Sequence, residues 1–368
     1  MDLLNSFLNL VVPPASLVMM AFAWPALCFV NGCEWLYNNF YSENMEDKVV
    51  IITGASSDIG EASSFQIAYE YAKRKANLVL VARRENRLRG ISQNARFMGA
   101  GHIITIAADV VKEEDCRRFV SETINVFGRV DHLVNTASLG HTFFFEEVTD
   151  TSIFPRLLDI NFWGNVYPTF VALPYLHESN GRVVVNASVE NWLPLPRMSL
   201  YASAKAALVT FYESLRFELN DEVGITIATH GWIGIEMTKG KFMLEDGAEM
   251  QWKEEREVHV AGGPVEDFAR LIVSGACRGD TYVKFPSWYD VFLLYRVFAP
   301  HVLNWTFRLL ISSEGARRTS LIGTGRPLLE GPPARPRLEG TSPRQVLSSP
   351  SSFFSQYSPS SSFSQYSP

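Results

Sequence analysis

Residues 48–60 read KVVIITGASSDIG, and this stretch decides the fold. Its run of β-branched residues, VVII, predicts a buried strand, because a strand covered on both faces of a parallel sheet reads as a continuous apolar run. The turn that follows, TGASSDIG, is built from small residues and leads into a helical pattern. Such a turn lets backbone amides and a helix N-terminus approach the pyrophosphate of a dinucleotide, although many turns use glycine only for geometry.

Five further runs have the same texture: NLVLVAR at 77–83, IITIAADV at 103–110, DHLVNTA at 131–137, GRVVVNAS at 181–188 and ITIATHGW at 225–232. Longer amphipathic stretches separate them. Strands alternating with helical patterns indicate βαβ units. We therefore expect an α/β fold over residues 45–280, a Rossmann-like, doubly wound parallel sheet with helices on both faces.

Composition excludes several classes of protein. The chain has 368 residues, of which 47% are hydrophobic and 20% charged, enough for one enzyme-sized domain with appendages. A net charge of -6 without a basic cluster argues against nucleic acid as a partner. The four cysteines form neither a CxxC pair nor a disulfide framework, so we expect reduced thiols and no metal site.

Residues 1–41 form the first appendage, an apolar segment interrupted by Pro13, Pro14 and Pro25. Residues 3–30 carry almost no charge, and their length suits a bilayer core about 30 Å thick. No basic region precedes them, so a cleaved signal peptide is not expected. A hairpin or interfacial anchor bent at Pro13 and Pro14, a simple span and a buried core helix all stay open, with a membrane-anchoring segment favoured.

Two further segments follow the domain. Residues 281–312 mix aromatic side chains with Lys284, Arg296 and Arg308, which suits either a membrane interface or a C-terminal helix packed on the core. Residues 313–368 are rich in Ser and Pro and end in a near repeat of FSQYSP. This tail is too poor in aliphatic residues to fold and is predicted to be disordered.

Polar residues follow the predicted strands where a dinucleotide would lie. Arg83 and Arg84 stand where an acid would bind the ribose hydroxyl of NAD(H), and a guanidinium there suits the 2′-phosphate of NADP(H). The alternative is a pair of exposed arginines on a solvated loop. Asp109 is placed to touch the adenine, while Asn135 and Ala137 would line the floor beneath the cofactor.

The most specific pattern is YASAK, with Tyr201 and Lys205 four residues apart on one helical face. A lysine ammonium and a charged nicotinamide would lower the tyrosine pKa from about 10, so that Tyr201 acts as general acid or base. Ser188, at the end of a strand, would hydrogen-bond the same substrate oxygen, and Asn161 would hold a water that passes a proton to Lys205. A YxxxK pair alone is more often an ordinary surface pair.

Together, TGASSDIG, the NTAS turn, Asn161, Ser188 and YASAK resemble the short-chain dehydrogenase/reductase superfamily. Within it the chain is most similar to the eleven-beta-hydroxysteroid dehydrogenase-like group. The opening residues 1–25, NFWGNVYPTFVALPYL at 161–176 and SVENWLPLPRMSLYASAK at 188–205 resemble plant steroleosins, the oil-body sterol dehydrogenases. The resemblance runs from residue 1 to about residue 313.

This resemblance implies NADP(H)-dependent oxidoreduction of a sterol-like substrate. It implies a monotopic anchor on a lipid droplet or the endoplasmic reticulum, with the catalytic domain facing the cytosol, and leaves a homodimer open. The implied catalytic residues are Tyr201, Lys205, Ser188 and Asn161, with Ser188 also binding substrate. The implied cofactor-binding residues are Gly54, Ser56, Ser57, Asp58, Ile59, Gly60, Arg83, Asp109, Val110, Asn135, Ala137, Tyr201, Lys205 and Ile233.

The chain departs from the family pattern in ways that weaken cofactor binding. Asp58 replaces the middle glycine of the turn and adds negative charge beside phosphates. About four extra residues, 62–65, begin the next helix, Thr136 and Ser138 replace a second Asn and a Gly, and Ile235 replaces a hydroxyl residue. A non-catalytic lipid-droplet coat or sterol-binding protein is therefore the rival function. A soluble NAD-dependent sugar or acyl reductase is disfavoured by the anchor and Arg83.

Overall fold

The computed structural model describes residues 2–40, 42–54, 61–140, 145, 148, 151–193, 198–220, 222–231, 241–242, 251–252, 265–306 and 308. Ser56, Ser57, Asp58, Ile59, Gly60, Ile233 and Ile235 therefore lie outside the described residues. Predictions about these seven residues stay predictions.

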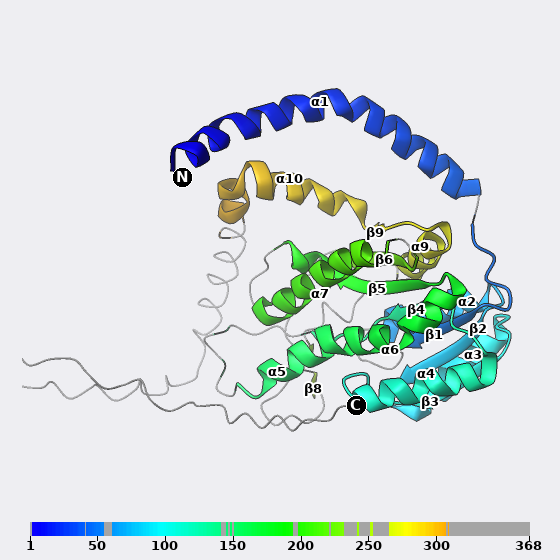
Figure 1. The fold of residues 1–368 in the computed structure, drawn as a ribbon. Helices are drawn as coiled ribbons and strands as arrows, with labels where there is room; N and C mark the ends of the chain where they lie inside the picture. The colour runs from blue at the N-terminus through cyan, green and yellow to red at the C-terminus, as the bar shows by residue number, and fades with distance from the viewer. Residues whose placement is uncertain are drawn as a thin grey trace, which may run out of the picture. The chain divides into compact units, whose positions relative to one another are not determined.

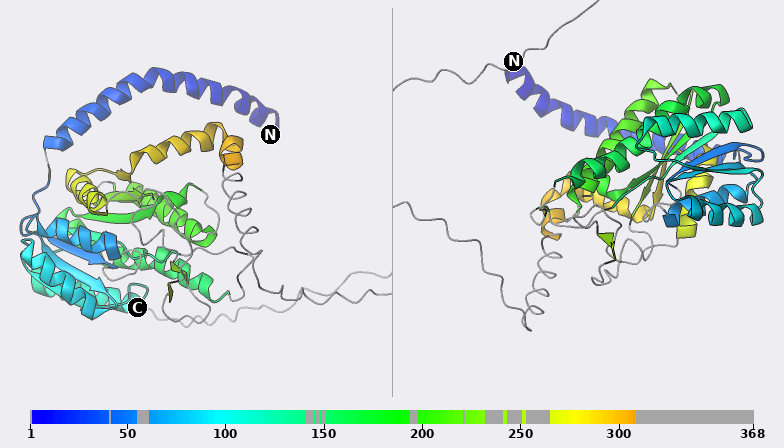
Figure 2. Two further views of the ribbon diagram at one scale, coloured as in Figure 1. Left: turned by 180° about the vertical axis from the view of Figure 1, so that it is seen from behind. Right: turned by 90° about the horizontal axis from the view of Figure 1, so that it is seen from below.

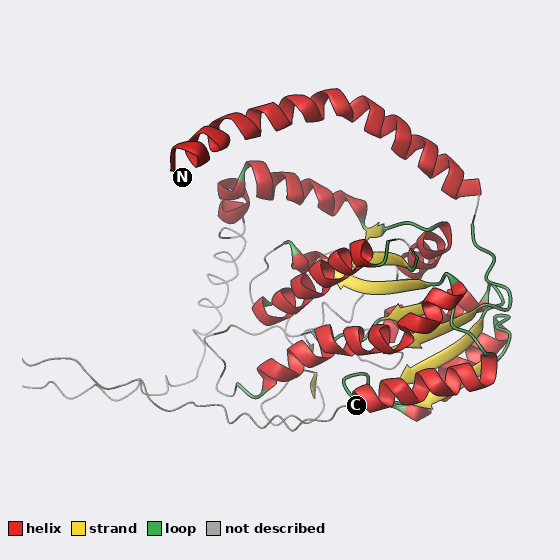
Figure 3. Ribbon diagram, in the orientation of Figure 1, coloured by secondary structure: helices red, strands yellow, loops and turns green. Residues whose placement is uncertain are grey.

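A seven-stranded parallel sheet forms the centre of the domain, in the order β3-β2-β1-β4-β5-β6-β9 (Figures 1 and 3). The strands are β1 (Val49–Thr53), β2 (Asn77–Ala82), β3 (Ile103–Ala107), β4 (His132–Asn135), β5 (Arg182–Ser188), β6 (Gly224–His230) and β9 (Tyr282–Phe285). The six predicted strands are thus confirmed, as is the doubly wound α/β sheet. A separate antiparallel pair joins β7 (Lys241–Phe242) to β8 (Gln251–Trp252).

The seventh strand corrects the expected domain end at residue 280. Strand β9 pairs in parallel with β6, with Val283 opposite Ala228, so the sheet continues into the segment taken from the sequence as an aromatic appendage. In the run YVKF only Val283 is buried, while Tyr282 and Lys284 are exposed and Phe285 is partly exposed, as expected for an edge strand. An edge strand this short lacks the continuous apolar run by which the central strands are recognised.

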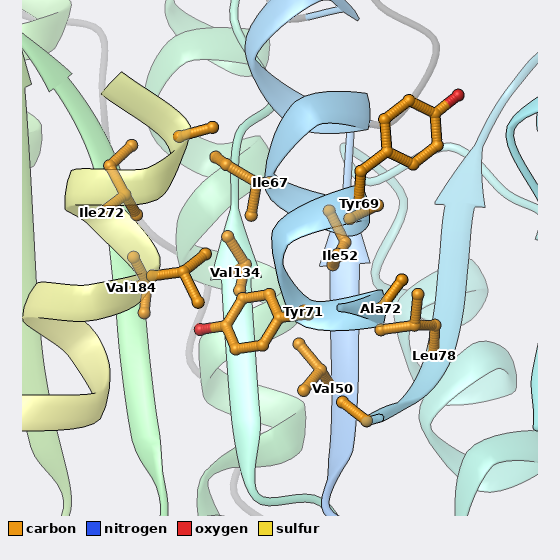
Figure 4. Packing of buried hydrophobic residues seen from close by; sticks show 14 of the residues in the cluster. Val50, Ile52, Ile67, Tyr69, Tyr71, Ala72, Leu78, Val134, Val184 and Ile272 are labelled. Carbon is orange, nitrogen blue, oxygen red and sulfur yellow. The ribbon is translucent and has the colours of Figure 1, made fainter. Parts of the chain in front are cut away.

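Helices cover both faces of the sheet (Figure 2). One face packs against α2 (Glu61–Ala72), α3 (Glu85–Phe97) and α9 (Val265–Arg278), and the other against α4 (Glu113–Phe127), α6 (Gly164–Ser179) and α7 (Ser199–Glu218). Successive strand residues alternate between the faces. Figure 4 shows Val50 and Ile52 with Ile67, Tyr71 and Ile272 in the first core. Burial of each aliphatic side chain stabilises the folded state by about 1.5–3 kcal/mol. The two helix layers therefore keep the sheet rigid, and with it the strand ends that carry the candidate residues.

The remaining helical elements are shorter. They are α5 (Ile153–Leu158), the π-helical turn η2 (Asp159–Trp163), the 3₁₀ turns η3 (Val189–Asn191) and η4 (Ser287–Tyr289), and α10 (Asp290–Phe298). In α10 the side chains of Val291, Tyr295, Val297 and Phe298 are exposed. A membrane-interfacial role for this helix stays a prediction.

The N-terminal apolar segment forms one long helix, α1 (Asp2–Phe40), in which Phe22 and Phe29 are 82% and 73% exposed. Among the described residues, no helix by itself has the length and hydropathy of a membrane span. The segments Leu10–Ser16 and Ala21–Val30, inclined by 40°, meet those criteria only as a bent pair. The break between the two segments thus lies at residues 17–20 rather than at Pro13 and Pro14, and the anchor stays a prediction.

A polar cluster closes the amino ends of the strands. Tyr71 Oη lies 2.8 Å from His132 Nδ1, and His132 Nε2 lies 3.1 Å from Glu43 Oε2. Lys48 Nζ lies 3.3 Å from Glu43 Oε1. Burial opposes ionisation of Glu43, but the hydrogen bond and charge of His132, together with Lys48, outweigh it and lower the carboxyl pKa from 4.5 to about 2. These contacts fix residue 43, just after α1, to the catalytic domain.

Candidate active site

Several of the candidate residues lie at the carboxyl ends of neighbouring strands. Gly54 follows β1, Arg83 follows β2, Asp109 lies just beyond β3, and Ser188 ends β5 opposite His230 at the end of β6. Successive strands are added in opposite directions from β1, so the order reverses between β1 and β4. Ligands of doubly wound sheets bind in the crevice outside the carboxyl ends at such a reversal. The sheet thus places Gly54, Arg83, Asp109 and Ser188 at the edge where doubly wound sheets bind ligands, and their roles toward a dinucleotide stay predictions.

Gly54 is required by the close approach of two strand ends. Its φ is +73°, and a Cβ at this position would come within 2.6 Å of the backbone nitrogen of Ala137. Thr136 Oγ1 also donates a hydrogen bond to the Thr53 carbonyl, which joins the same two strand ends. A side chain at residue 54 would separate them, so the glycine has a geometric reason that is independent of any ligand.

The four extra residues predicted at 62–65 belong to α2, which begins at Glu61. Ser64 is fully buried, and its Oγ donates to the Gly54 carbonyl at 3.4 Å. Because four residues make about one helical turn, α2 accommodates the extra length without losing its apolar face, as expected from the sequence.

The residues expected to contact the adenosine half of the cofactor follow strands β2 and β3. Arg83 is exposed directly after β2, whereas Arg84 is partly buried. The Asp109 amide donates to Asp115 Oδ2 at 2.8 Å, and Val110 is 8% exposed. The exposure of Arg83 leaves its guanidinium accessible to a phosphate, and its role stays a prediction.

Asn135 differs from its expected role. Its side chain is fully buried, and Nδ2 donates to Thr169 Oγ1 at 2.9 Å and to Asn165 O at 3.0 Å. It also lies 3.2 Å from Tyr212 Oη, which ties β4 to α6 and α7. The side chain therefore faces the helix layer rather than a cofactor floor, because the alternation of a strand turns it to that side.

Tyr201 and Lys205 lie together on α7, as the spacing predicted. Both are fully buried, and Lys205 Nζ lies 5.7 Å from the centroid of the Tyr201 ring. The ammonium donates to the Asn186 carbonyl at 2.9 Å, which anchors it to β5. We call Tyr201, Lys205, Ser188 and Asn161 the catalytic cluster.

The net effect of the protein's own residues is to raise the pKa of Tyr201. Burial raises it well above 10, the charge of Glu190 raises it further, and the Ser138 and Ser188 hydroxyls lower it only in part. Burial lowers the pKa of Lys205 from 10.5 to about 7, against the attraction of Glu190. The lowering expected from Lys205 together with a charged nicotinamide concerns the cofactor-bound protein, and it stays a prediction.

Ser188 has a partner that the sequence analysis missed. Its Oγ donates to Glu190 Oε2, and the His230 carbonyl lies 3.4 Å from the same oxygen. Ser188 is fully buried and Glu190 is 2% exposed, so the contact lies inside the protein. The acid two positions after Ser188, in the sequence SVEN, was the available signal.

Asn161 lies in the π-helical turn η2, a local feature that often marks functional sites. Its Nδ2 donates to Leu139 O at 2.7 Å and Leu157 O at 2.9 Å, while its Oδ1 accepts from Leu139 N and Ser138 Oγ, both at 3.0 Å. These four hydrogen bonds occupy the side chain. Its expected role in holding a water is therefore wrong for the side-chain amide, which instead pins the loop after β4 to the turn.

The described residues fit a bound nicotinamide cofactor and an oxygen-containing substrate. Tyr201 Oη is buried and makes no hydrogen bond to any described atom, although the Ser138 and Ser188 hydroxyls influence its pKa. An unpaired buried hydroxyl costs free energy unless a ligand supplies its partner. Asn186 lies on β5, and its backbone carbonyl accepts the hydrogen bond from Lys205. Its side-chain oxygen Oδ1 is also buried and makes no hydrogen bond to any described atom. Both atoms belong to the strand and helix that carry Ser188 and Lys205.

Known proteins are similar to this chain over most of its length. The family model for short chain dehydrogenase matches residues 48–244. The "11-beta-hydroxysteroid dehydrogenase B" of Arachis hypogaea is 76% identical over 338 residues, covering 90% of this chain and 95% of that protein. The "11-beta-hydroxysteroid dehydrogenase-like 5" of Arabidopsis thaliana is 74% identical over 325 residues, covering 88% and 82%.

Solved structures show the same fold at lower identity. A short chain dehydrogenase/reductase from Burkholderia phymatum, solved in complex with NAD, superposes with a TM-score of 0.60 at 22% identity. The match covers 70% of this chain and 96% of that chain. At this identity the likeness supports the fold alone.

Proposed function

The chain belongs to the short-chain dehydrogenase family, and we propose that it is an NADP(H)-dependent enzyme that interconverts hydroxyl and carbonyl groups on a sterol-like substrate. The observation that carries the proposal is the burial of Tyr201 beside Lys205 on α7, next to Ser188 at the carboxyl end of β5. The names of the hydroxysteroid dehydrogenases that it resembles support the substrate class. The exposed Arg83 supports NADP(H) over NAD(H).

The residues that would hold the cofactor follow the strand ends. Gly54 permits the close approach of β1 and β4, Arg83 would take the 2′-phosphate, and Asp109 would face the adenine. Tyr201 and Lys205 would border the nicotinamide end. A bound nicotinamide supplies the hydride in reduction and accepts it in oxidation.

The chain's own residues control the proton. Because burial and Glu190 raise its pKa, Tyr201 holds its phenolic proton in the protein alone and can donate it to a carbonyl oxygen. Ser188, at the carboxyl end of β5, would lie beside the same substrate oxygen. Lys205, with a pKa of about 7, can exchange a proton near neutral pH while its hydrogen bond to Asn186 O keeps it in place. In oxidation Tyr201 would accept the proton of the substrate hydroxyl only after it has given up its own phenolic proton, because its raised pKa keeps it protonated in the protein alone.

We also propose that α1 holds the enzyme on a lipid droplet or the endoplasmic reticulum, with the catalytic domain in the cytosol. The exposed apolar side chains of α1 and α10, including Phe22, Phe29 and Phe298, support this location. They are compatible with the rival function as well, a non-catalytic coat or sterol-binding protein. Cofactor binding separates the two.

The test is a titration of the purified full-length protein with NADPH and NADH, followed by a panel of hydroxysteroids and ketosteroids. We expect NADPH to bind about tenfold or more tightly than NADH, a difference of about 1.4 kcal/mol. Tyr201→Phe should lose turnover by about a hundredfold or more, the range for removal of a general acid, while NADPH binding persists. Tyr175→Phe, on α6, is the matched control.

Two results would exclude the proposal. Failure of the wild-type protein to bind either cofactor would favour the coat protein. Turnover by the Tyr201→Phe variant within a few-fold of the wild-type rate would show that another group supplies the proton.

A further inference from the structure

Glu190 is a buried carboxylate within reach of the catalytic cluster, and the mechanism above gives it no direct task. It lies in η3, two residues after Ser188, and is 2% exposed. Its charge raises the pKa of both Tyr201 and Lys205, so it lies close to both members of that pair. A buried acid that only filled space would be costly, since an ionised group is kept inside a protein only with specific partners.

The hydrogen bond between Ser188 and Glu190 decides whether Ser188 can donate a hydrogen bond to a substrate or only accept one. A hydroxyl has one proton to donate and two lone pairs to accept with. Ser188 Oγ donates its proton to Glu190 Oε2, and the His230 carbonyl at 3.4 Å is the longer contact. Hydrogen bonds to ionised acceptors are roughly twice as strong as those between neutral groups. The carboxylate therefore holds the serine proton, and the free side of Ser188 Oγ is an acceptor.

We propose that Glu190 is a specificity-determining positioning residue that makes Ser188 a hydrogen-bond acceptor, so that the site selects the hydroxyl form of its substrate over the carbonyl form. This inference rests on the proposed function in one respect, that Ser188 meets the substrate oxygen. A substrate hydroxyl donates to Ser188 Oγ and accepts from Tyr201 Oη. A carbonyl oxygen accepts from Tyr201 but meets only lone pairs at Ser188, and such a mismatch discriminates against it.

Equilibrium binding tests the selection without chemistry. The full-length protein is titrated with an alcohol in the presence of NADPH and with the matching ketone in the presence of NADP⁺, two combinations that cannot react. Two probe pairs are used: decalol with decalone, and a hydroxysteroid with its ketosteroid. We expect the wild-type protein to bind each alcohol about tenfold or more tightly than its ketone.

Glu190→Gln should reverse the role of Ser188. The amide nitrogen of glutamine can donate to Ser188 Oγ, which releases the serine proton for a carbonyl oxygen. We expect the ratio of alcohol to ketone affinity to fall about tenfold, mainly because the ketone binds more tightly. Tighter ketone binding separates this effect from misfolding, which would weaken both ligands. Glu178→Gln, an exposed acid on α6, is the charge-matched control and should leave the ratio unchanged.

Ser188→Ala supplies a second, independent variant. This variant should lose the preference for the alcohol although Glu190 is intact. The double variant Ser188→Ala with Glu190→Gln should have the same ratio of alcohol to ketone affinity as Ser188→Ala alone. Such non-additivity is expected when one residue acts through the other. A ratio that Glu190→Gln shifts equally with and without Ser188 would overturn the proposal, since Glu190 would then contact the substrate directly. Equal wild-type affinity for decalol and decalone would overturn it as well.

The two probe pairs separate this inference from the proposed substrate class. If the decalol and decalone pair behaves as expected while neither steroid binds, the sterol assignment fails and the role of Glu190 stands. If both steroids bind and turn over but their affinity ratio is insensitive to Glu190→Gln, the proposed function stands and the role of Glu190 fails.

Discussion

Lys205→Met should stabilise the protein while it removes activity. Lys205 is fully buried, and burial lowers its pKa from 10.5 to about 7, even with the opposing attraction of Glu190. A depressed lysine pKa means that the fold favours the neutral amine over the ammonium. The charged form is therefore a net cost to the folded state, and methionine has a similar length without the charge.

The size of this cost follows from the two pKa values. The gap between 10.5 and about 7 corresponds to about 5 kcal/mol if all of it is expressed as stability. The variant also loses the hydrogen bond from Nζ to Asn186 O, with a net value of about 1 kcal/mol, and leaves that carbonyl unpaired at a cost of about 1–3 kcal/mol. We therefore expect the free energy of unfolding to rise by about 2 kcal/mol near neutral pH.

The pH dependence gives the sign of the effect. Below a pH of about 7 both the folded and the unfolded chain hold the lysine proton, so the folded wild-type protein bears the full cost. Between about 7 and 10.5 only the unfolded chain holds it, so wild-type stability rises with pH relative to the variant. The advantage of Lys205→Met should thus be largest in weak acid and disappear in strong base.

The assay is urea unfolding of the two full-length proteins in detergent, followed by tryptophan fluorescence at about pH 6, about pH 8 and about pH 10. Lys112→Met, which removes an exposed ammonium, is the control and should change little at any pH. A Lys205→Met protein less stable than wild type at about pH 6, or a difference that does not vary with pH, would refute the reasoning.

Three further outcomes are expected. Glu43→Gln should weaken the contacts of this carboxylate with Lys48 and His132 and lower the free energy of unfolding by about 1 kcal/mol at neutral pH. The expected loss is small because the Glu43 side chain is 35% exposed and solvent screens its charge. Since the folded pKa of Glu43 is about 2, the wild-type advantage should vanish between pH 4.5 and 2; equal stabilities at neutral pH would contradict this. Arg83→Ala should reduce the ratio of NADPH to NADH affinity about tenfold. Arg89→Ala, which removes an exposed arginine paired with Glu85, should leave this ratio unchanged. An unchanged ratio in Arg83→Ala would mean that another cation binds the 2′-phosphate. A reporter carrying residues 1–41 should collect on lipid droplets, and a diffuse signal in droplet-containing cells would show that α1 is insufficient.

Local pattern was enough for much of the fold. Six of the seven strands of the main sheet could be predicted because central parallel strands are buried on both faces and read as β-branched runs. The pairing of Tyr201 with Lys205 was also predictable, because four residues make about one helical turn and place both on one face of α7. The edge strand β9 was missed because it is short and buries only Val283, so YVKF has no continuous apolar run to separate a strand from an aromatic appendage.

The sequence by itself determined the strands, the YASAK helix and the small-residue turn, since each depends on residues close together in the chain. Only the tertiary structure decided which way each polar side chain faces and what it contacts. It turned Asn135 into the interior, occupied the amide of Asn161, and kept the pKa of Tyr201 high by burial. It also brought Glu190 onto Ser188 through the 3₁₀ turn after β5. Burial and hydrogen bonding are properties of packed neighbours, so no spacing along the chain specifies them.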